Sequence, residues 1–75
     1  MSIKEIKEVI NLLKIGKKIK AYREKIGLTQ KELAYKLGTS ERMIIYIEKD
    51  NRYPSLPLLD RMRGLFNCSF GDILD

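Results

Sequence analysis

The chain has 75 residues, a formal net charge of +5 and a pI near 9.5. That length supports one domain with a modest core, and the basic balance favours a polyanionic partner, of which nucleic acid is the commonest. The sequence has no histidine, the commonest general base and metal ligand, and its single cysteine, Cys68, excludes an intrachain disulfide and a multi-cysteine metal site.

The composition also argues against catalysis and membrane insertion. No Gly-rich phosphate loop is present and no nucleophile–base pair can be assembled, so we expect no enzyme, no cofactor and no metal site. The N-terminus shows no signal peptide, because Lys4, Glu5, Lys7 and Glu8 interrupt any apolar run, and no membrane span is expected. We therefore expect a cytoplasmic protein, or one associated with the nucleoid through DNA.

The first predicted element is an amphipathic helix over residues 3–13. Its apolar residues recur at spacings of three and four, with lysines and glutamates between them: Ile3, Ile6, Ile10 and Leu13. Residues 11–14 either break this helix or carry it into the next one. We favour a helix packed on its own domain, because an apolar stripe usually covers the nearest core. The alternative is a dimerisation or DNA-embracing element.

The domain proper is expected to cover residues 15–75, with residues 1–14 as the N-terminal extension. Its first helix is predicted over about residues 15–25 and is closed by Gly27. The inward-facing residues of this helix are expected to be Ile15, Ile19, Tyr22 and Ile26.

Residues 29–48 predict two short helices joined by a tight turn. Thr29 and Glu32 have the spacing of a capping box at the first helix start. Gly38 suits the left-handed conformation that often ends a helix. Such a pair forms a helix-turn-helix, which can offer its second helix to the major groove of DNA.

The second helix of this pair is predicted to start at Ser40, a good N-cap. Ile44 and Ile47 form its inner face. The apolar run 43–47 alone would also be compatible with a buried strand, but the Ser40 cap and the flanking charges favour a helix.

Residues 50–54 predict a loop, because Pro54 disfavours helical backbone at the residue before it. Ser55 is expected to cap the next helix. The core face of that helix is predicted to comprise Leu56, Leu59, Met62 and Phe66.

Ser69 is expected to cap a short final helix in which Ile73 and Leu74 fold back on the core. Cys68 lies between two phenylalanines and is interpreted as a small core residue.

From Ile15 to about Leu74 the chain resembles the phage repressor and Cro family, the XRE-type regulators. The resemblance rests on Ile15-Gly16, Gly27-Leu28-Thr29-Gln30, Glu32-Leu33-Ala34, Leu37-Gly38, Ser40, Ile44, Ile47-Glu48, Arg52, Pro54-Ser55 and Ile73-Leu74. It implies an all-α, five-helix lambda-repressor-like DNA-binding domain, here with an extra N-terminal amphipathic helix. It further implies a homodimeric repressor that binds double-stranded operator DNA sequence-specifically, with helix 40–49 in the major groove.

The resemblance assigns the base edges to the first turn and outer face of that helix. The residues carried over are Ser40, Glu41, Arg42, Ile45 and Tyr46. Arg42 can donate twice to guanine, Glu41 can accept from cytosine, and Ile45 can touch a thymine methyl. The alternatives are a phosphate-pairing Arg42, a Glu41 that only favours the helix dipole, and an Ile45 meant for a protein partner.

Phosphate contacts are expected around the same helix. Gln30, with the backbone amides at its helix start, matches a phosphate-holding position, and Lys49, Asn51 and Arg52 flank the far end.

By the same resemblance, Arg23 and Glu48 form a partly buried, structural ion pair between two helices.

Three features depart from the family pattern. Asp50 replaces a glycine that ends the recognition helix, so the left-handed turn costs more or is rearranged, and a negative charge lies near the phosphates. Met43 and Ile45 replace small polar residues, which makes the expected DNA face unusually apolar. Arg63 replaces a small buried residue, so its head must reach solvent or find a partner. These departures keep a second function open: a protein-interaction module on the same fold, such as an antitoxin.

Overall fold

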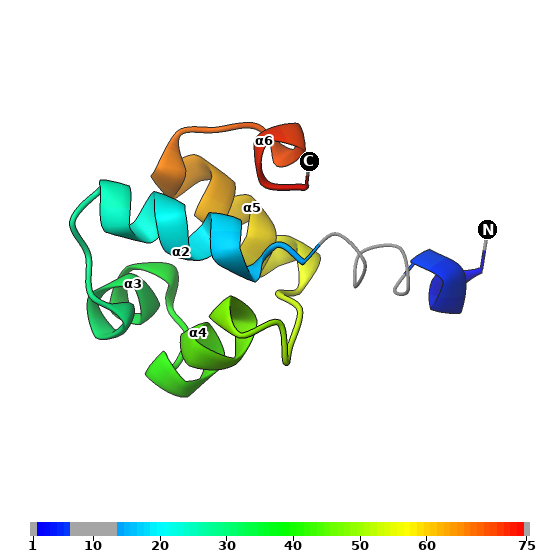
Figure 1. Ribbon diagram of the computed structural model, residues 1–75, viewed down its shortest axis with the longest axis horizontal. Helices are drawn as coiled ribbons and strands as arrows, with labels where there is room; N and C mark the ends of the chain where they lie inside the picture. The colour runs from blue at the N-terminus through cyan, green and yellow to red at the C-terminus, as the bar shows by residue number, and fades with distance from the viewer. Residues whose placement is uncertain (1, 7–13, 75) are drawn as a thin grey trace.

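A computed structural model describes residues 2–6 and 14–74, and in these residues every regular element is a helix (Figure 1). Residues 3–6 are helical at the N-terminal end. The remaining elements are α2 (Gly16–Lys25), α3 (Gln30–Leu37), α4 (Glu41–Glu48), α5 (Leu56–Phe66) and α6 (Phe70–Leu74). The predicted all-α architecture, with five helices after residue 14, is confirmed.

The predicted helix starts are confirmed at each capping residue. Thr29 Oγ1 accepts the Glu32 amide at 3.0 Å, and Glu32 Oε1 accepts the Thr29 amide at 2.9 Å, which completes the capping box of α3. Ser40 Oγ and Ser55 Oγ cap α4 and α5 by accepting one hydrogen bond each, from the Met43 amide and the Leu58 amide respectively. Ser69 Oγ accepts the Asp72 amide at 3.1 Å in α6. Local chemistry therefore sets where each of these helices begins.

Four helices end in a left-handed residue: Gly27, Gly38, Asp50 and Asn67. After each of them, the next amide bonds back to a carbonyl oxygen five residues earlier, as in a Schellman motif. Gly27 and Gly38 take this conformation without strain, whereas Asp50 and Asn67 carry a side chain there.

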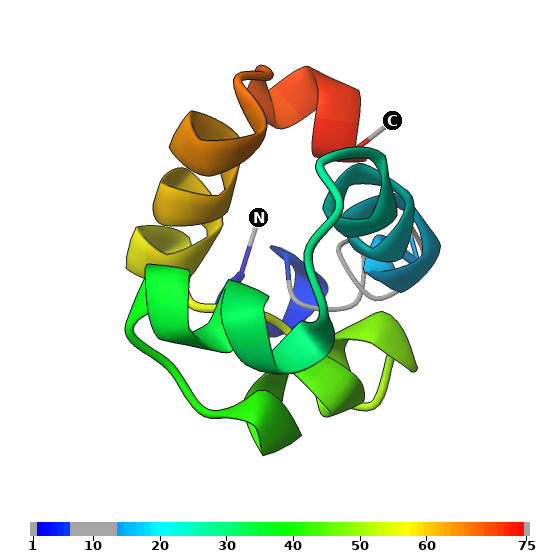
Figure 2. The ribbon, with the colours of Figure 1, turned by 90° about the vertical axis from the view of Figure 1, so that its left-hand side faces the viewer.

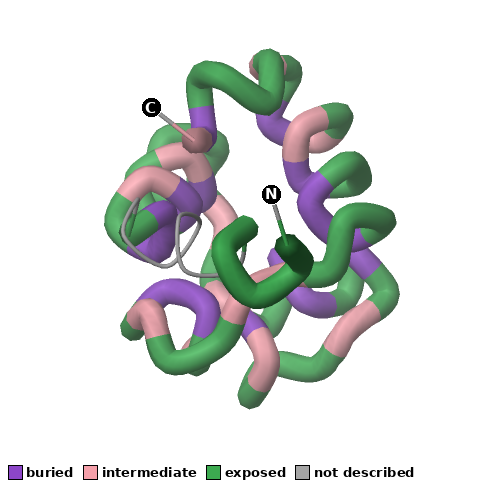
Figure 3. Tube along the Cα trace, turned by 90° about the vertical axis from the view of Figure 1, so that its right-hand side faces the viewer, coloured by how far each residue is buried: buried purple, intermediate pink, exposed green. Residues whose placement is uncertain are grey.

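The core lies where α2, α3, α4, α5 and α6 converge (Figures 2 and 3). Its fully buried side chains are Ile15, Ile19, Leu33, Ile44, Ile47, Met62 and Ile73. Tyr22 stacks on Phe66 with ring centroids 5.3 Å apart and closes the core between α2 and α5. Cys68 is half-buried and packs against this core, and burial raises the pKa of its thiol.

Two predicted core positions are wrong. Ile26 is 40% exposed, because α2 ends at Lys25 and the helical period no longer directs the next side chain inward. Leu56 is 73% exposed at the first position of α5, whereas Leu58 is buried with Leu59, Met62 and Phe66. The inward face of α5 therefore starts two residues later than predicted.

The apolar stripe at the N-terminus does not pack as expected over its described part. Ile3 is 74% exposed and Ile6 is 44% exposed, so the favoured interpretation of a helix buried on its own domain is wrong for these two residues. Ile10 and Leu13, the other members of the stripe, lie outside the described residues. Within residues 2–6 and 14–74, no helix is long and apolar enough to cross a membrane.

Candidate nucleic-acid interface

Helices α3 and α4 form the helix-turn-helix, and the turn between them spans residues 38–40. The two helices pack together at the bottom of the view in Figure 2. The turn is tight because Gly38 adopts φ of 70° and the next residue but one, Ser40, already caps α4. Ile44 and Ile47 are fully buried on α4, so its opposite side faces outward.

The outward side of α4 carries the predicted base-reading residues. Ser40, Glu41, Arg42 and Tyr46 are exposed, and Ile45 is half-buried between them. The hydroxyl oxygen of Ser40 is engaged with the Met43 amide at 3.1 Å, so only its hydrogen remains for a base or phosphate. Ser40, Glu41 and Arg42 lie at the N-terminal end of α4, and Ile45 and Tyr46 lie one turn further along the helix, outside its buried face.

Met43 behaves differently from the expectation of an apolar DNA face. Its side chain is half-buried and packs against the core rather than standing free on α4. The unusual apolar character of the outer face therefore rests mainly on Ile45.

The predicted phosphate residues lie at two places around α4. Lys49, Asn51 and Arg52 follow its last turn and are exposed. Gln30 lies at the first position of α3, half-buried, and its Nε2 donates to Glu48 Oε1 at 3.1 Å. The structure thus places Gln30 against the end of α4, while its contact with a phosphate stays a prediction.

The start of α3 carries a charge of its own. Hydrogen bonds from the backbone and side chain of Thr29 lower the pKa of Glu32, so this carboxylate stays ionised in the first turn. The capping box occupies the amides of Thr29 and Glu32. The amides of Gln30 and Lys31 are the first two of α3 and have no acceptor within residues 2–6 and 14–74.

Arg23 and Glu48 form an ion pair that ties α2 to α4. Arg23 Nε donates to Glu48 Oε2 at 2.7 Å and Nη2 donates to Oε1 at 3.0 Å, a bidentate geometry. The side chains are only 11% and 3% exposed. Hydrogen bonding to Glu48 raises the pKa of Arg23, and Arg23 Nη1 also donates to the Leu28 carbonyl at 2.8 Å.

Asp50 has the left-handed backbone expected for the glycine it replaces, with φ of 60°. Its side chain performs a function that the sequence did not reveal: Oδ1 accepts the Gly16 amide at 2.9 Å, across the junction of α4 and α2. The sequence offered one signal for this contact, namely that Ile15 at the start of α2 has no side-chain oxygen to cap the helix. Asp50, which supplies the acceptor, lies 34 positions away from Gly16. The charge expected near the phosphate path is therefore directed at the start of α2.

Arg63, the third departure from the pattern, finds partners on the surface. Its Nε and Nη2 donate to Asp60 Oδ1 at 3.1 and 2.8 Å, and its guanidinium lies 5.2 Å from the Phe70 ring centroid. No buried charge results from this replacement.

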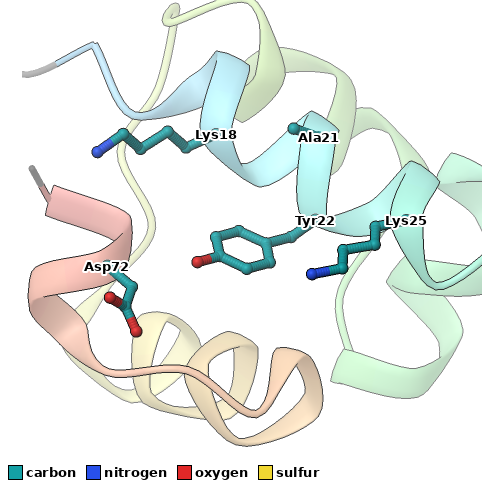
Figure 4. Close-up of a pocket in the computed structure, with 5 residues that line it drawn as sticks. All are labelled: Lys18, Ala21, Tyr22, Lys25 and Asp72. Atoms are coloured by element: carbon teal, nitrogen blue, oxygen red, sulfur yellow. The ribbon is translucent and has the colours of Figure 1, made fainter.

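A shallow pocket of about 310 Å³ lies between α2 and α6 (Figure 4). Lys18, Ala21, Tyr22, Lys25 and Asp72 line it, and none of them belongs to the predicted DNA site. Asp72 already accepts the Ser69 amide at 2.9 Å as part of the α6 cap.

Known proteins are similar to this chain over the part that runs from α2 into α6. The helix-turn-helix family HTH_3 matches residues 19–73. An uncharacterized HTH-type transcriptional regulator of Archaeoglobus fulgidus is 38% identical over 75% of this chain and 80% of its own length. The uncharacterized regulator MJ0272 of Methanocaldococcus jannaschii is 45% identical over 75% of this chain and 85% of its own. The HTH-type transcriptional regulator ImmR of Bacillus subtilis is 37% identical over 76% of this chain and 45% of its own.

No solved structure matches the chain. The family match covers both helices of the motif and the packing helices around them, and the relatives are similar over the same length of chain. The chain belongs to the helix-turn-helix family of DNA-binding transcriptional regulators.

Proposed function

We propose that this protein is a transcriptional repressor that binds double-stranded operator DNA sequence-specifically as a homodimer. The observation that carries the proposal is the division of α4 into two sides. Its inner side is buried through Ile44 and Ile47, while Glu41, Arg42 and Tyr46 stand exposed on the outer side. A helix held in this way can enter the major groove without loss of its packing.

In the proposed complex, the first turn and outer face of α4 read bases. Arg42 donates to guanine O6 and N7, and Ile45 contacts a thymine methyl. Glu41 accepts from a cytosine amino group, and Ser40 and Tyr46 donate hydroxyl hydrogens to bases or to the adjoining phosphates.

The phosphates are held from both ends of the motif. The amides at the start of α3 with Gln30 bind one phosphate, and Lys49, Asn51 and Arg52 bind others beyond α4. Lys49 and Arg52 carry positive charge at the α4 end, in keeping with the formal net charge of +5, whereas the α3 end offers backbone amides and a neutral amide side chain. Dimerisation places two copies of α4 one helical turn of DNA apart, so that a palindromic operator is read twice.

The experiment that tests this proposal is selection from a randomised duplex library, followed by titration of the preferred duplex across salt concentrations. We expect a consensus with two-fold symmetry and a steep log–log salt dependence, because several counterions are released. Arg42→Ala should cost about 1–3 kcal/mol and relax preference at one base pair. Arg52→Ala should weaken all duplexes alike and lower the salt slope by about one.

The second candidate is a protein-interaction module such as an antitoxin, and the position of Ile45 favours it. This apolar side chain lies half-buried on the outer face of α4, between charged and hydroxyl neighbours. If the protein binds no duplex DNA even at low salt, the result would contradict the DNA proposal and support the protein-interaction module. Uracil in place of thymine at the affected position should reproduce part of the Ile45→Ala loss if Ile45 contacts DNA.

A further inference from the structure

The N-terminus of α2 lacks a cap of its own. Its N-cap position is Ile15, which has no side-chain oxygen, and no acidic residue lies in the first turn of the helix. The missing acceptor comes from the far end of α4: Asp50 Oδ1 lies 2.9 Å from the Gly16 nitrogen. A carboxylate at the positive end of a helix is stabilised both by the hydrogen bond and by the helix dipole.

The backbone of α2 approaches α4 closely at the same point. A Cβ placed on Gly16 would lie 2.6 Å from the carbonyl oxygens of Ile47 and Glu48 and 2.9 Å from Asp50 Oδ1. Only glycine permits this approach, so the hydrogen bond joins two segments already in van der Waals contact. We call this contact between Gly16 and Asp50 the α2–α4 clasp.

The clasp lies directly before the predicted phosphate residues. Asp50 is the left-handed residue after α4, and the amide of Asn51 bonds back to the Tyr46 carbonyl at 2.8 Å. Asn51 and Arg52 follow immediately, and both side chains are exposed. Because the Asp50 side chain is anchored to α2, the direction in which the chain leaves α4 is set from two sides.

We propose that Asp50 is a positioning residue for phosphate binding: through the α2–α4 clasp it holds Asn51 and Arg52 in the orientation that meets the DNA backbone. This inference rests on the proposed function. It explains why an acidic residue is compatible with a position beside DNA, since its charge faces the start of α2 instead of the phosphates. It also explains why aspartate is accepted at a left-handed position where glycine is less strained.

Two variants with the same change of charge separate positioning from electrostatics. Asp50→Asn keeps a side-chain oxygen for the Gly16 amide and tolerates the left-handed backbone, whereas Asp50→Gly keeps only the backbone conformation. We expect Asp50→Asn to bind the preferred duplex at least as tightly as the unmodified protein. We expect Asp50→Gly to bind about three- to tenfold more weakly than Asp50→Asn, the size of effect of one hydrogen bond.

A double-mutant cycle shows whether the effect passes through the following segment. In an Asn51→Ala, Arg52→Ala background, the difference between Asp50→Asn and Asp50→Gly should disappear, because the residues to be positioned are gone. Equal affinities of the two Asp50 variants in the original background would overturn the proposal. So would a difference that persists undiminished in the double-alanine background.

Amide exchange of Gly16 without DNA tests the clasp separately. We expect slow exchange in the unmodified protein and in Asp50→Asn, and faster exchange in Asp50→Gly. Equal exchange in all three proteins would overturn the clasp whatever the DNA result. If exchange follows the expectation but no duplex binds at low salt, the proposed function fails and the positioning role fails with it, while the clasp stands as a purely structural contact.

Discussion

Gln30 donates its side-chain amide to Glu48, with 3.1 Å between Nε2 and Oε1. The same carboxylate accepts hydrogen bonds from Nε and Nη2 of Arg23. One nearly buried carboxylate at the end of α4 therefore joins the start of α3 to the last turn of α2. The helix proposed to read bases and the helix start proposed to hold a phosphate are fixed relative to each other through this group.

The first prediction concerns the buried pair. Glu48→Ala should lower the free energy of unfolding by about 3–5 kcal/mol, because it leaves Arg23 buried without its partner. Asp60→Ala is the matched control, because it breaks the exposed ion pair between Asp60 and Arg63. The side chain of Arg63 is 38% exposed and that of Asp60 is 57% exposed. That control should change stability by at most about 1 kcal/mol. Urea unfolding of the three proteins measures both effects, and similar losses in the two variants would contradict the prediction.

The second prediction concerns the two roles of Gln30. Gln30→Ala leaves the Arg23–Glu48 pair intact, so stability should fall by only about 1 kcal/mol for the lost hydrogen bond. Affinity should fall by a similar factor on every duplex, because a phosphate contact carries no sequence information. Tyr35→Ala provides a control on the same helix, since Tyr35 is 88% exposed and outside the proposed interface. A change in the preferred sequence of Gln30→Ala would argue against the phosphate role.

The helix ends could be predicted because their causes are local. Thr29 with Glu32, Ser40, Ser55 and Gly38 each act within three or four residues, so their spacing in the sequence is their geometry in the fold. The inner faces of α3 and α4 followed from helical periodicity in the same way.

Apart from Ile26, which is exposed because α2 ends at Lys25, the errors and omissions have non-local causes. The exposure of Leu56 depends on how α5 docks against the other helices, and Ile3 and Ile6 are exposed although their spacing is that of a buried helix face. The Asp50–Gly16 hydrogen bond joins residues 34 positions apart, and no local pattern encodes it. The Gln30–Glu48 contact was missed because the family pattern treats Gln30 only as a residue that faces DNA.

The third prediction compares two glycines. Gly16→Ala should destabilise the fold by about 1–3 kcal/mol, because the new Cβ meets two backbone carbonyl oxygens that cannot move independently. Gly64→Ala should instead stabilise it by about 0.5–1 kcal/mol, since a Cβ there meets nothing within 4 Å and Gly64 lies inside α5. Thermal melts should therefore shift in opposite directions. A stabilising Gly16→Ala would contradict the close approach of α2 and α4.

The fourth prediction is a pH dependence. The hydrogen bonds from Thr29 lower the pKa of Glu32 in the folded state below its ordinary value of 4.5, so Glu32 contributes stability above that pH and loses it as the pH falls through the folded value. Hydrogen bonds from Ser69 lower the pKa of Asp72 in the same sense. Glu32→Gln and Asp72→Asn should each be less stable than the unmodified protein at neutral pH. As the pH falls, the free energies of unfolding of the variants and of the unmodified protein should converge. Urea unfolding between neutral pH and the acid transition measures this difference. A difference in stability that stays constant with pH would contradict the lowered pKa values of Glu32 and Asp72.

The fifth prediction concerns the N-terminal stripe. Ile3 and Ile6 are exposed, so they contribute little burial to the domain. The double variant Ile3→Ser, Ile6→Ser should therefore change the free energy of unfolding by no more than about 0.5 kcal/mol per site at low protein concentration. By contrast, a fully buried isoleucine would contribute about 1.5–3 kcal/mol.

Thermal melts at low and high protein concentration, together with sedimentation equilibrium, separate the remaining roles of the stripe. If two copies meet through these isoleucines, the double variant should raise the dimer dissociation constant and remove any rise of the melting temperature with concentration. If the stripe meets DNA instead, sedimentation should be unaltered and the affinity for duplex should fall. A melting temperature lowered by several degrees at low concentration would show that Ile3 and Ile6 pack on their own domain after all, because about 1 kcal/mol shifts the melt of a domain of this size by about 4–8 °C.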